Sequence, residues 1–191
     1  MDNTRNNTFH NRGAARNVGR GLLVALMALG LTGFASAQNN TDSETFLKFK
    51  GGIGVIPVTG VAANGTVNLN VVRGVPPGAP WRIADLEAVV GPDGHIKVVG
   101  RGLLLASGNG IGTNAGQSVH ATLFCGAATA ATAHNSNPAG VALEADGDFR
   151  IDDFLSPALT TPCDTPVLLI RNVGGVWFAA GIPKLQEEDR R

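Results

Sequence analysis

Apolar and polar residues alternate with a period of two along several short stretches of this chain. Residues 66–72 place Val67, Leu69 and Val71 between asparagines, and residues 118–125 alternate in the same way up to Cys125. Because successive side chains of a strand point to opposite faces, this period predicts strands with one covered face. We therefore expect residues 66–72 to form a half-buried strand and residues 118–125 a central strand with Cys125 pointing inward.

Turn-forming residues separate these stretches at regular intervals. Asn64-Gly65, Pro92-Asp93-Gly94 and Asp146-Gly147 are typical of tight turns. They predict hairpins that join residues 81–90 to 95–99 and residues 141–144 to 148–152, and a loop is expected over residues 127–138. Further strands are expected at residues 46–50, 103–106, 166–171 and 176–180. About eight or nine short strands predict an all-β fold, either an antiparallel β-sandwich of the Ig-like, Greek-key kind or a Greek-key barrel.

The first 37 residues have the three parts of a secretory signal peptide. Arginines precede an apolar run at residues 22–31, and Ala35-Ser36-Ala37 forms a small-x-small cleavage site. The apolar run is shorter than the roughly 20 residues of a membrane-spanning helix, which disfavours the alternative of an uncleaved anchor. The sequence predicts cleavage before Gln38 and a secreted or periplasmic protein with no stable membrane span after cleavage.

The exported part of the chain has the length of one domain. About 150 residues can bury a single adequate core. We expect a flexible leader at residues 38–45, a β-sandwich domain at residues 46–185 and a disordered, charged tail at residues 186–191.

The two cysteines, Cys125 and Cys163, both fall in the exported part. In an oxidising compartment, one disulfide bond is the simplest interpretation. A redox pair or a zinc site remains the alternative, although both usually need more closely spaced cysteines or further ligands.

Charge and glycine content exclude some classes of function. The chain has 15 basic and 15 acidic residues, and no basic cluster indicates nucleic-acid binding. The Gly-rich stretch 107–117 lacks the spacing of a nucleotide-binding loop and is followed by a predicted strand, so no cofactor is expected. As a surface loop it offers Asn109 and Asn114 as candidate binding residues.

Candidate metal ligands are spread along the chain. His95, His120, Asp146 and Asp148 are the candidates, within a wider acidic set that could bind calcium. No two histidines after residue 37 lie within four residues of each other, so we expect solvent-facing histidines as the alternative to a metal site. No serine lies in a nucleophile elbow, and the sequence predicts that the protein is not an enzyme.

Trp81 and Trp177 are the largest side chains of the predicted domain. Tryptophan usually packs in a core or at a sheet edge. The alternative is an exposed platform that stacks against sugars or against a partner surface.

Apolar strand segments along residues 46–185 carry a resemblance to a known family. These segments are residues 119–126, the hairpin around 147–149, and residues 166–170 with 177–182. They resemble uncharacterised secreted bacterial β-domains, which are distantly similar to CHRD-type β-domains. Val55-Ile56-Pro57-Val58 is similar to the segment that opens a CHRD domain, whereas the His-x-His-like segment of that family is reduced here to His120. The resemblance implies a secreted β-sandwich and no particular activity.

The predicted function is that of a secreted or periplasmic, non-catalytic module for binding or structure. Its partner is expected to be a cell-envelope component or an extracellular protein. One alternative is a metal-dependent secreted enzyme that uses His95 and His120. The other is a carbohydrate- or cell-wall-binding domain that uses Trp81 or Trp177.

Overall fold

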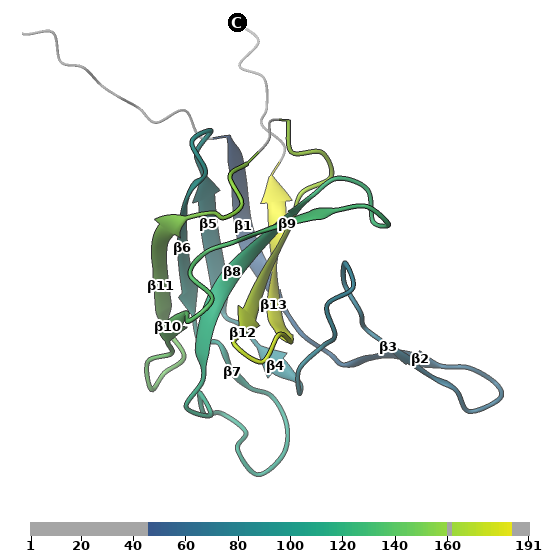
Figure 1. The fold of residues 1–191 in the computed structure, drawn as a ribbon. Helices are drawn as coiled ribbons and strands as arrows, with labels where there is room; N and C mark the ends of the chain where they lie inside the picture. Colours follow the sequence, from purple (N-terminus) through teal and green to yellow (C-terminus); the bar gives the residue numbers. More distant parts are fainter. Residues whose placement is uncertain (1–45, 160–161, 185–191) are drawn as a thin grey trace, which may run out of the picture. The chain divides into compact units, whose positions relative to one another are not determined.

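The computed structural model describes residues 46–159 and 162–184. The predicted signal peptide (1–37), the leader (38–45) and the tail (186–191) lie outside the described residues. The described residues form thirteen strands and no helix (Figure 1). The strands are β1 (Leu47–Gly54), β2 (Val58–Val61), β3 (Val67–Leu69), β4 (Trp81–Arg82), β5 (Asp85–Val90), β6 (His95–Arg101), β7 (Leu104–Leu105), β8 (Ser118–Cys125), β9 (Thr132–Asn135), β10 (Val141–Ala142), β11 (Phe149–Phe154), β12 (Val167–Asn172) and β13 (Trp177–Lys184).

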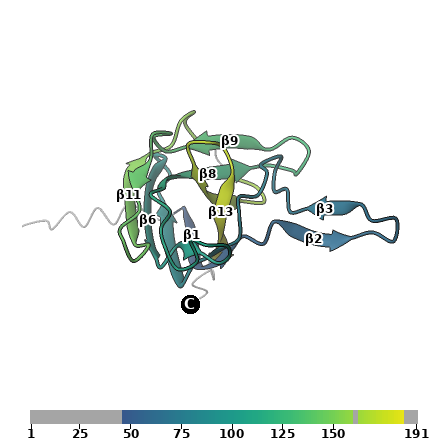
Figure 2. The same ribbon diagram turned by 90° about the horizontal axis from the view of Figure 1, so that it is seen from below.

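Nine of these strands form one antiparallel sheet that curls until it nearly closes (Figure 2). Its order is β10-β8-β12-β13-β1-β5-β6-β11, and β9 pairs with the same edge of β8 as β10 does. The two end strands, β10 and β11, contact each other. The predicted all-β, antiparallel fold with one disulfide is therefore confirmed, with more and shorter strands than the pattern indicated.

The hairpins of the sheet follow the turn chemistry of the sequence. Gly94 adopts a φ of 83° between β5 and β6, a conformation that side chains with a Cβ rarely adopt. Leu86 and Val90 on β5 and Ile96 on β6 point into the core, as their alternation predicts. The predicted strand 81–90 is divided into β4, which pairs with β7, and β5. The predicted loop 127–138 contains β9, because its backbone groups pair with the free edge of β8.

Strand β8 is buried on both faces, which its alternating sequence did not indicate. Every residue from Val119 to Cys125 is buried, including His120. His120 lies opposite Arg171 on β12, and Arg171 lies opposite Trp177 on β13, so the three share one face. Trp177 donates its indole N–H to the carbonyl of Asn70. The segment around residues 70–78 therefore covers the face that the pattern assigned to solvent.

The disulfide bond between Cys125 and Cys163 is present. It joins the last residue of β8 to the segment that leads into β12, across 38 positions of the sequence. Both cysteines are buried among the apolar residues of the core. The bond therefore ties a long connection to a central strand.

Strands β2 and β3, with their connecting turn, form a separate two-stranded ribbon that we call the arm (residues 58–69). Asn64-Gly65 makes the predicted turn between them. In Figures 1 and 2 the arm extends away from the nine-stranded sheet. Val67 and Leu69 are exposed, so the prediction of a half-buried strand is wrong, because no second layer lies beneath this ribbon within the described residues.

The described part of the chain contains no helix long and apolar enough to cross a membrane.

Candidate functional site

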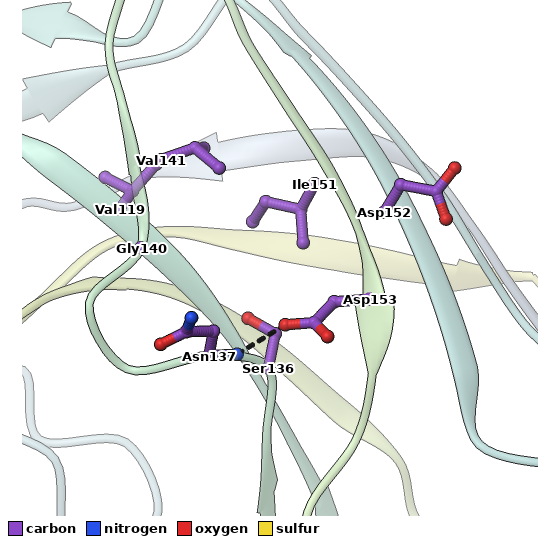
Figure 3. Close-up of a pocket in the computed structure, with 8 residues that line it drawn as sticks. All are labelled: Val119, Ser136, Asn137, Gly140, Val141, Ile151, Asp152 and Asp153. Atoms are coloured by element: carbon purple, nitrogen blue, oxygen red, sulfur yellow. Dashed lines mark hydrogen bonds between the residues drawn. The ribbon is translucent and has the colours of Figure 1, made fainter.

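The two ends of the curled sheet leave a polar gap, which we call the seam, between β8 and β10 on one side and β11 on the other. A recess of about 290 Å3 lies in the seam (Figure 3). A second recess of about 280 Å3 adjoins it, and the two share Ser136, Asn137 and Asp153 in their walls. Phe154 and Ser156 line only the second recess. The seam is the candidate functional site.

Asp153 and Asn137 bridge the seam. The backbone N–H of Asn137 donates to Oδ2 of Asp153 over 2.6 Å, and the N–H of Phe154 donates to Oδ1 of the same carboxylate over 2.8 Å. No cationic side chain forms an ion pair with Asp153 among the described residues. The carboxylate therefore stands in the wall of both recesses without a cationic partner, and its remaining lone pairs can accept hydrogen bonds from a ligand.

Ser136 completes the edge of β8 between the stretches paired with β9 and with β10. Its backbone N–H donates to the carbonyl of Ala121, and its hydroxyl accepts the N–H of Ala121 over 3.0 Å. The side chain thereby supplies the acceptor that a ladder partner would otherwise provide. Ser136 is buried, so its part in this site is to hold the wall of the recess in place.

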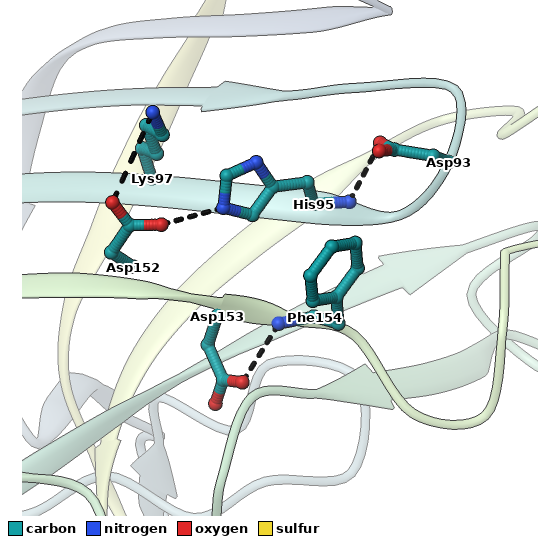
Figure 4. Close-up of polar contacts among 6 residues, drawn as sticks. All are labelled: Asp93, His95, Lys97, Asp152, Asp153 and Phe154. Carbon is teal, nitrogen blue, oxygen red and sulfur yellow. Dashed lines mark hydrogen bonds and ion pairs between the residues drawn. The ribbon is translucent and has the colours of Figure 1, made fainter.

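His95, Asp152 and Phe154 form a polar and aromatic cluster beside the second recess (Figure 4). Nε2 of His95 and Oδ1 of Asp152 lie 2.5 Å apart, and Lys97 approaches the other carboxylate oxygen at 3.9 Å. The rings of His95 and Phe154 stack, with centroids 4.8 Å apart and planes 23° apart. Phe154 is 59% exposed, so one face of a ring held by stacking is offered to solvent at the rim of the recess.

A histidine bonded to an aspartate is half of a nucleophilic catalytic set, but the third member is missing from this cluster. A nucleophile must lie within hydrogen-bond reach of the base. Ser136 lines the recess, yet its oxygen already accepts the backbone N–H of Ala121. Within residues 46–159 and 162–184, the imidazole of His95 bonds to Asp152 and stacks on Phe154, and neither residue is a nucleophile of this kind. The arrangement holds the ring of Phe154 and the carboxylate of Asp152 in fixed positions, which suits the binding of a ligand.

The structure does not bring the predicted metal ligands together. His95 lies on β6 and His120 on β8, which are not neighbours in the sheet. Asp146 and Asp148 are used in the turn before β11, where Asp146 accepts the N–H of Asp148 and Asp148 accepts the N–H of Gly102. Across the described ranges, no three His, Cys, Asp or Glu side chains are grouped closely enough to hold a metal ion. The metal-site interpretation of these four residues is therefore wrong, because the topology separates them.

The alternative expectation of solvent-facing histidines also fails for His120. Burial, and then the nearby positive charge of Arg171, lower the pKa of His120 below its ordinary value of 6.5. Its Nδ1 is buried without a hydrogen-bond partner. A neutral imidazole is therefore favoured at this position, and protonation would place a second cation beside Arg171.

The tryptophans do not form an exposed platform. Trp81 is 4% exposed and stacks on Phe178, with ring centroids 4.2 Å apart. Trp177 is 3% exposed. The interpretation of either ring as a sugar-stacking surface is wrong, because both rings are buried among the apolar residues of the core.

The Gly-rich stretch 107–117 is folded back on itself by backbone hydrogen bonds to Leu105. Asn114 donates its side-chain amide to the carbonyls of Leu143 and Glu144, so it fastens this loop to the turn before β11. Asn109 is exposed. Neither asparagine lines a recess of the seam.

Sequence reasoning missed Phe154, Ser136 and Asn137, and it considered Asp153 only as a member of the acidic set that could bind calcium. One signal was available: on β11, Phe149 and Ile151 point inward and Asp152 points outward, so Phe154 falls in the outward register of the strand. This register predicts that the ring of Phe154 lies on the outer face of the strand. Ser136 and Asn137 carried no such signal, since they lie in a stretch that resembles an ordinary loop.

Comparison of the chain with family models, with curated proteins and with solved structures finds no match in any of the three. The resemblance to CHRD-type β-domains stays a prediction.

Proposed function

We propose that this protein is an exported, non-catalytic binding module whose ligand site is the second recess of the seam, beside Phe154. The observation that carries the proposal is an exposed aromatic ring, fixed by stacking on His95, in a recess whose wall also includes Asp153, a carboxylate with no cationic partner among the described residues. A ligand with one apolar face and several hydroxyl groups fits these two features. Glycans have this chemistry. We therefore retain the predicted alternative of carbohydrate or cell-wall binding, with Phe154 as the stacking residue in place of Trp81 or Trp177.

The polar groups of the recess match a hydroxyl-rich ligand in detail. Asp153 accepts two backbone N–H bonds and has lone pairs left for hydroxyl donors. The side-chain oxygen of Asn137 accepts the N–H of Ala139, while its NH2 group makes no hydrogen bond to any of the described residues. Asp153 and Phe154 are successive residues of β11, and their side chains point to opposite faces of this edge strand (Figure 4). A glycan that uses both groups therefore has to reach around the strand, with its hydroxyls on Asp153 and Asn137 and a C–H face on the ring of Phe154. Sites of this kind combine an apolar surface with a few fixed polar groups.

The absence of a nucleophile beside His95 supports binding without turnover, as far as the described residues extend. The hydrogen bond and the ion pair that hold Asp152 serve the same end, because they fix the orientation of His95 and through it the ring of Phe154. Preorganised side chains lower the entropy cost of binding a weak, flexible ligand.

Export is part of the proposal. The Arg-rich start, the apolar run at residues 22–31 and the Ala35-Ser36-Ala37 site support a cleavable signal peptide, and a disulfide between buried cysteines is compatible with an oxidising compartment. N-terminal sequencing of the protein recovered outside the cytoplasm is expected to begin at Gln38. Recovery of the full chain in the cytoplasm with reduced cysteines would contradict export.

The binding proposal is tested by titrating the 15N-labelled protein with a panel of soluble cell-wall and capsular glycan fragments. We expect saturable chemical-shift changes at Asn137, Asp153 and Phe154, and no consumption of the ligand. Phe154→Ala should weaken binding by about five- to thirtyfold, since stacking on one ring is worth roughly 1–2 kcal/mol. Ile53→Ala is the matched control, because Ile53 is also 59% exposed and lies on β1.

Two results would contradict the proposal. Binding that Phe154→Ala leaves unchanged would place the ligand elsewhere on the protein. Saturable turnover of any member of the panel would show that the His95–Asp152 pair acts as a base and that the module is an enzyme.

A further inference from the structure

The arm has one apolar face that the described residues leave uncovered. Val61 lies opposite Val67, and Val58 lies opposite Leu69. Because Val67 and Leu69 are two residues apart on β3, both pairs lie on the same side of the ribbon. An irregularity in register between Val58 and Gly60 lets β2 place residues three apart on that side. The four side chains are between 42% and 65% exposed.

The opposite face of the arm is polar. Asn68 lies between Val67 and Leu69 on β3 and therefore points to the other side, opposite Gly60. The hydroxyl of Thr59 donates to the carbonyl of Asn68 and helps to hold the two strands together. The arm is thus an amphipathic ribbon. An isolated two-stranded ribbon of this size is marginally stable in water unless its apolar face is covered.

The lack of charged residues in the arm limits the kinds of partner that it can bind. No charged residue occurs between Lys50 and Arg73, a stretch that includes the whole arm. A nucleic acid or a strongly charged protein surface would find no complementary charge there. A second copy of the same ribbon would meet no like-charge repulsion, and its apolar face has the same length and the same alternation.

We propose that the apolar face of the arm packs against the same face of a second copy of this chain, around a twofold axis. An interface in which each copy contributes the same patch is the commonest arrangement of soluble oligomers. Two arms packed face to face would bury an area on the order of 1,000 Å2, below the roughly 1,200–2,000 Å2 of stable specific complexes, so the dimer is weak and reversible. The interface is separate from the recess beside Phe154 and does not depend on a ligand there.

The arm offers a matched pair of substitutions for the test. Val67→Lys places an ammonium group in the apolar face, and Asn68→Lys places the same group on the polar face of the same strand. Both positions are exposed in the single chain, so both variants should fold, which circular dichroism and the intact Cys125–Cys163 bond would verify. Association through any other part of the chain would be unaffected by either substitution.

Sedimentation velocity of the purified protein, from roughly 1 µM to 1 mM, measures the association directly. We expect a concentration-dependent monomer–dimer equilibrium for the natural chain, a similar equilibrium for Asn68→Lys, and a dissociation constant raised at least about tenfold for Val67→Lys. A natural chain that is monomeric throughout would overturn the proposal, as would a dimer that Val67→Lys leaves intact or that both variants weaken equally. A monomer that instead binds phosphatidylcholine vesicles, and loses this binding in Val67→Lys, would assign the apolar face to a lipid surface.

Discussion

Strands β3 and β8 have the same alternating sequence pattern and opposite surroundings. Leu69 on β3 is more than half exposed, whereas Leu123 on β8 is completely buried. On β8 the polar positions are covered as well, because the segment around residues 70–78 packs over the face that carries His120. On β3 the apolar positions are left open. Alternation therefore reports that a segment is a strand with two unlike faces, and it does not report whether either face is covered.

The difference between the two strands comes from long-range connections. Strand β8 has β12 along one edge, β9 and β10 along the other, and a disulfide at its end. Strand β3 has only β2 as a partner within the described residues. The sheet around β8 is held by neighbouring strands along both edges, whereas the apolar face of the arm is exposed and available to a second molecule. The following predictions test this contrast, beginning with the largest effect.

The disulfide should account for much of the stability of the sheet. Replacing Cys125 and Cys163 by serine frees a loop of 38 positions, and the chain-entropy model gives a loss of about 4 kcal/mol in the free energy of unfolding. Urea denaturation of the oxidised protein and of the double variant measures this loss. A loss below about 1 kcal/mol would mean that the packing around β8 holds the connection without the covalent bond.

A matched leucine pair compares the two strands directly. Leu123→Ala removes a fully buried side chain and should lower the free energy of unfolding by about 3 kcal/mol. Leu69→Ala removes one that is already in water, and at low protein concentration it should change that free energy by less than about 0.5 kcal/mol. Equal losses in urea denaturation would show that the arm is packed against the sheet in solution.

The hydroxyl of Ser136 should stabilise the folded protein because it accepts a hydrogen bond from the buried backbone N–H of Ala121. Ser136→Ala leaves the N–H of Ala121 without its acceptor, and a buried unsatisfied donor costs about 1–3 kcal/mol. Ser107→Ala, at an exposed serine in the Gly-rich loop, is the control and should have no measurable effect on unfolding. The amide of Ala121 should also exchange faster with solvent in the Ser136→Ala variant.

Acid should weaken the sheet through His120. The pKa of His120 is lowered in the folded protein, so the unfolded chain binds a proton more readily once the pH falls below about 6.5. The stability that depends on the neutral imidazole is therefore complete above that pH and is lost progressively below it, by at most about 1.4 kcal/mol per pH unit. His120→Leu should flatten this part of the stability–pH curve, and an unchanged curve would show that His120 does not titrate during unfolding.

The parts of the fold that depend on neighbours in sequence could be predicted, and the parts that depend on distant segments could not. The hairpin turns at Asn64-Gly65 and Gly94 follow from local backbone preferences, and the disulfide follows from two cysteines in a chain with a predicted export signal. The curling of the sheet depends on the pairing of β1 with both β5 and β13, which no local pattern encodes. For the same reason the burial of His120 and Trp177 could not be predicted.

The candidate site was beyond prediction because it arises where the sheet nearly closes. Asp153 and Asn137 are separated along the chain by β10 and a turn, and they meet only after the two end strands approach each other. The metal ligands proposed from sequence are residue types that bind metals in general, but His95 and His120 fall on strands that the topology keeps apart. The outward register of Phe154 was the one feature of the site that the sequence contained.

The most direct test of the contrast between the sheet and the arm is the accessibility of methyl groups to a soluble paramagnetic probe, measured by NMR at low and at high protein concentration. The account predicts that the methyl groups of Val119 and Leu123 are shielded at both concentrations. Those of Val67 and Leu69 should be accessible in dilute solution and shielded in concentrated solution. Arm methyl groups that are shielded even at the lowest concentration, or accessible at every concentration, would contradict it.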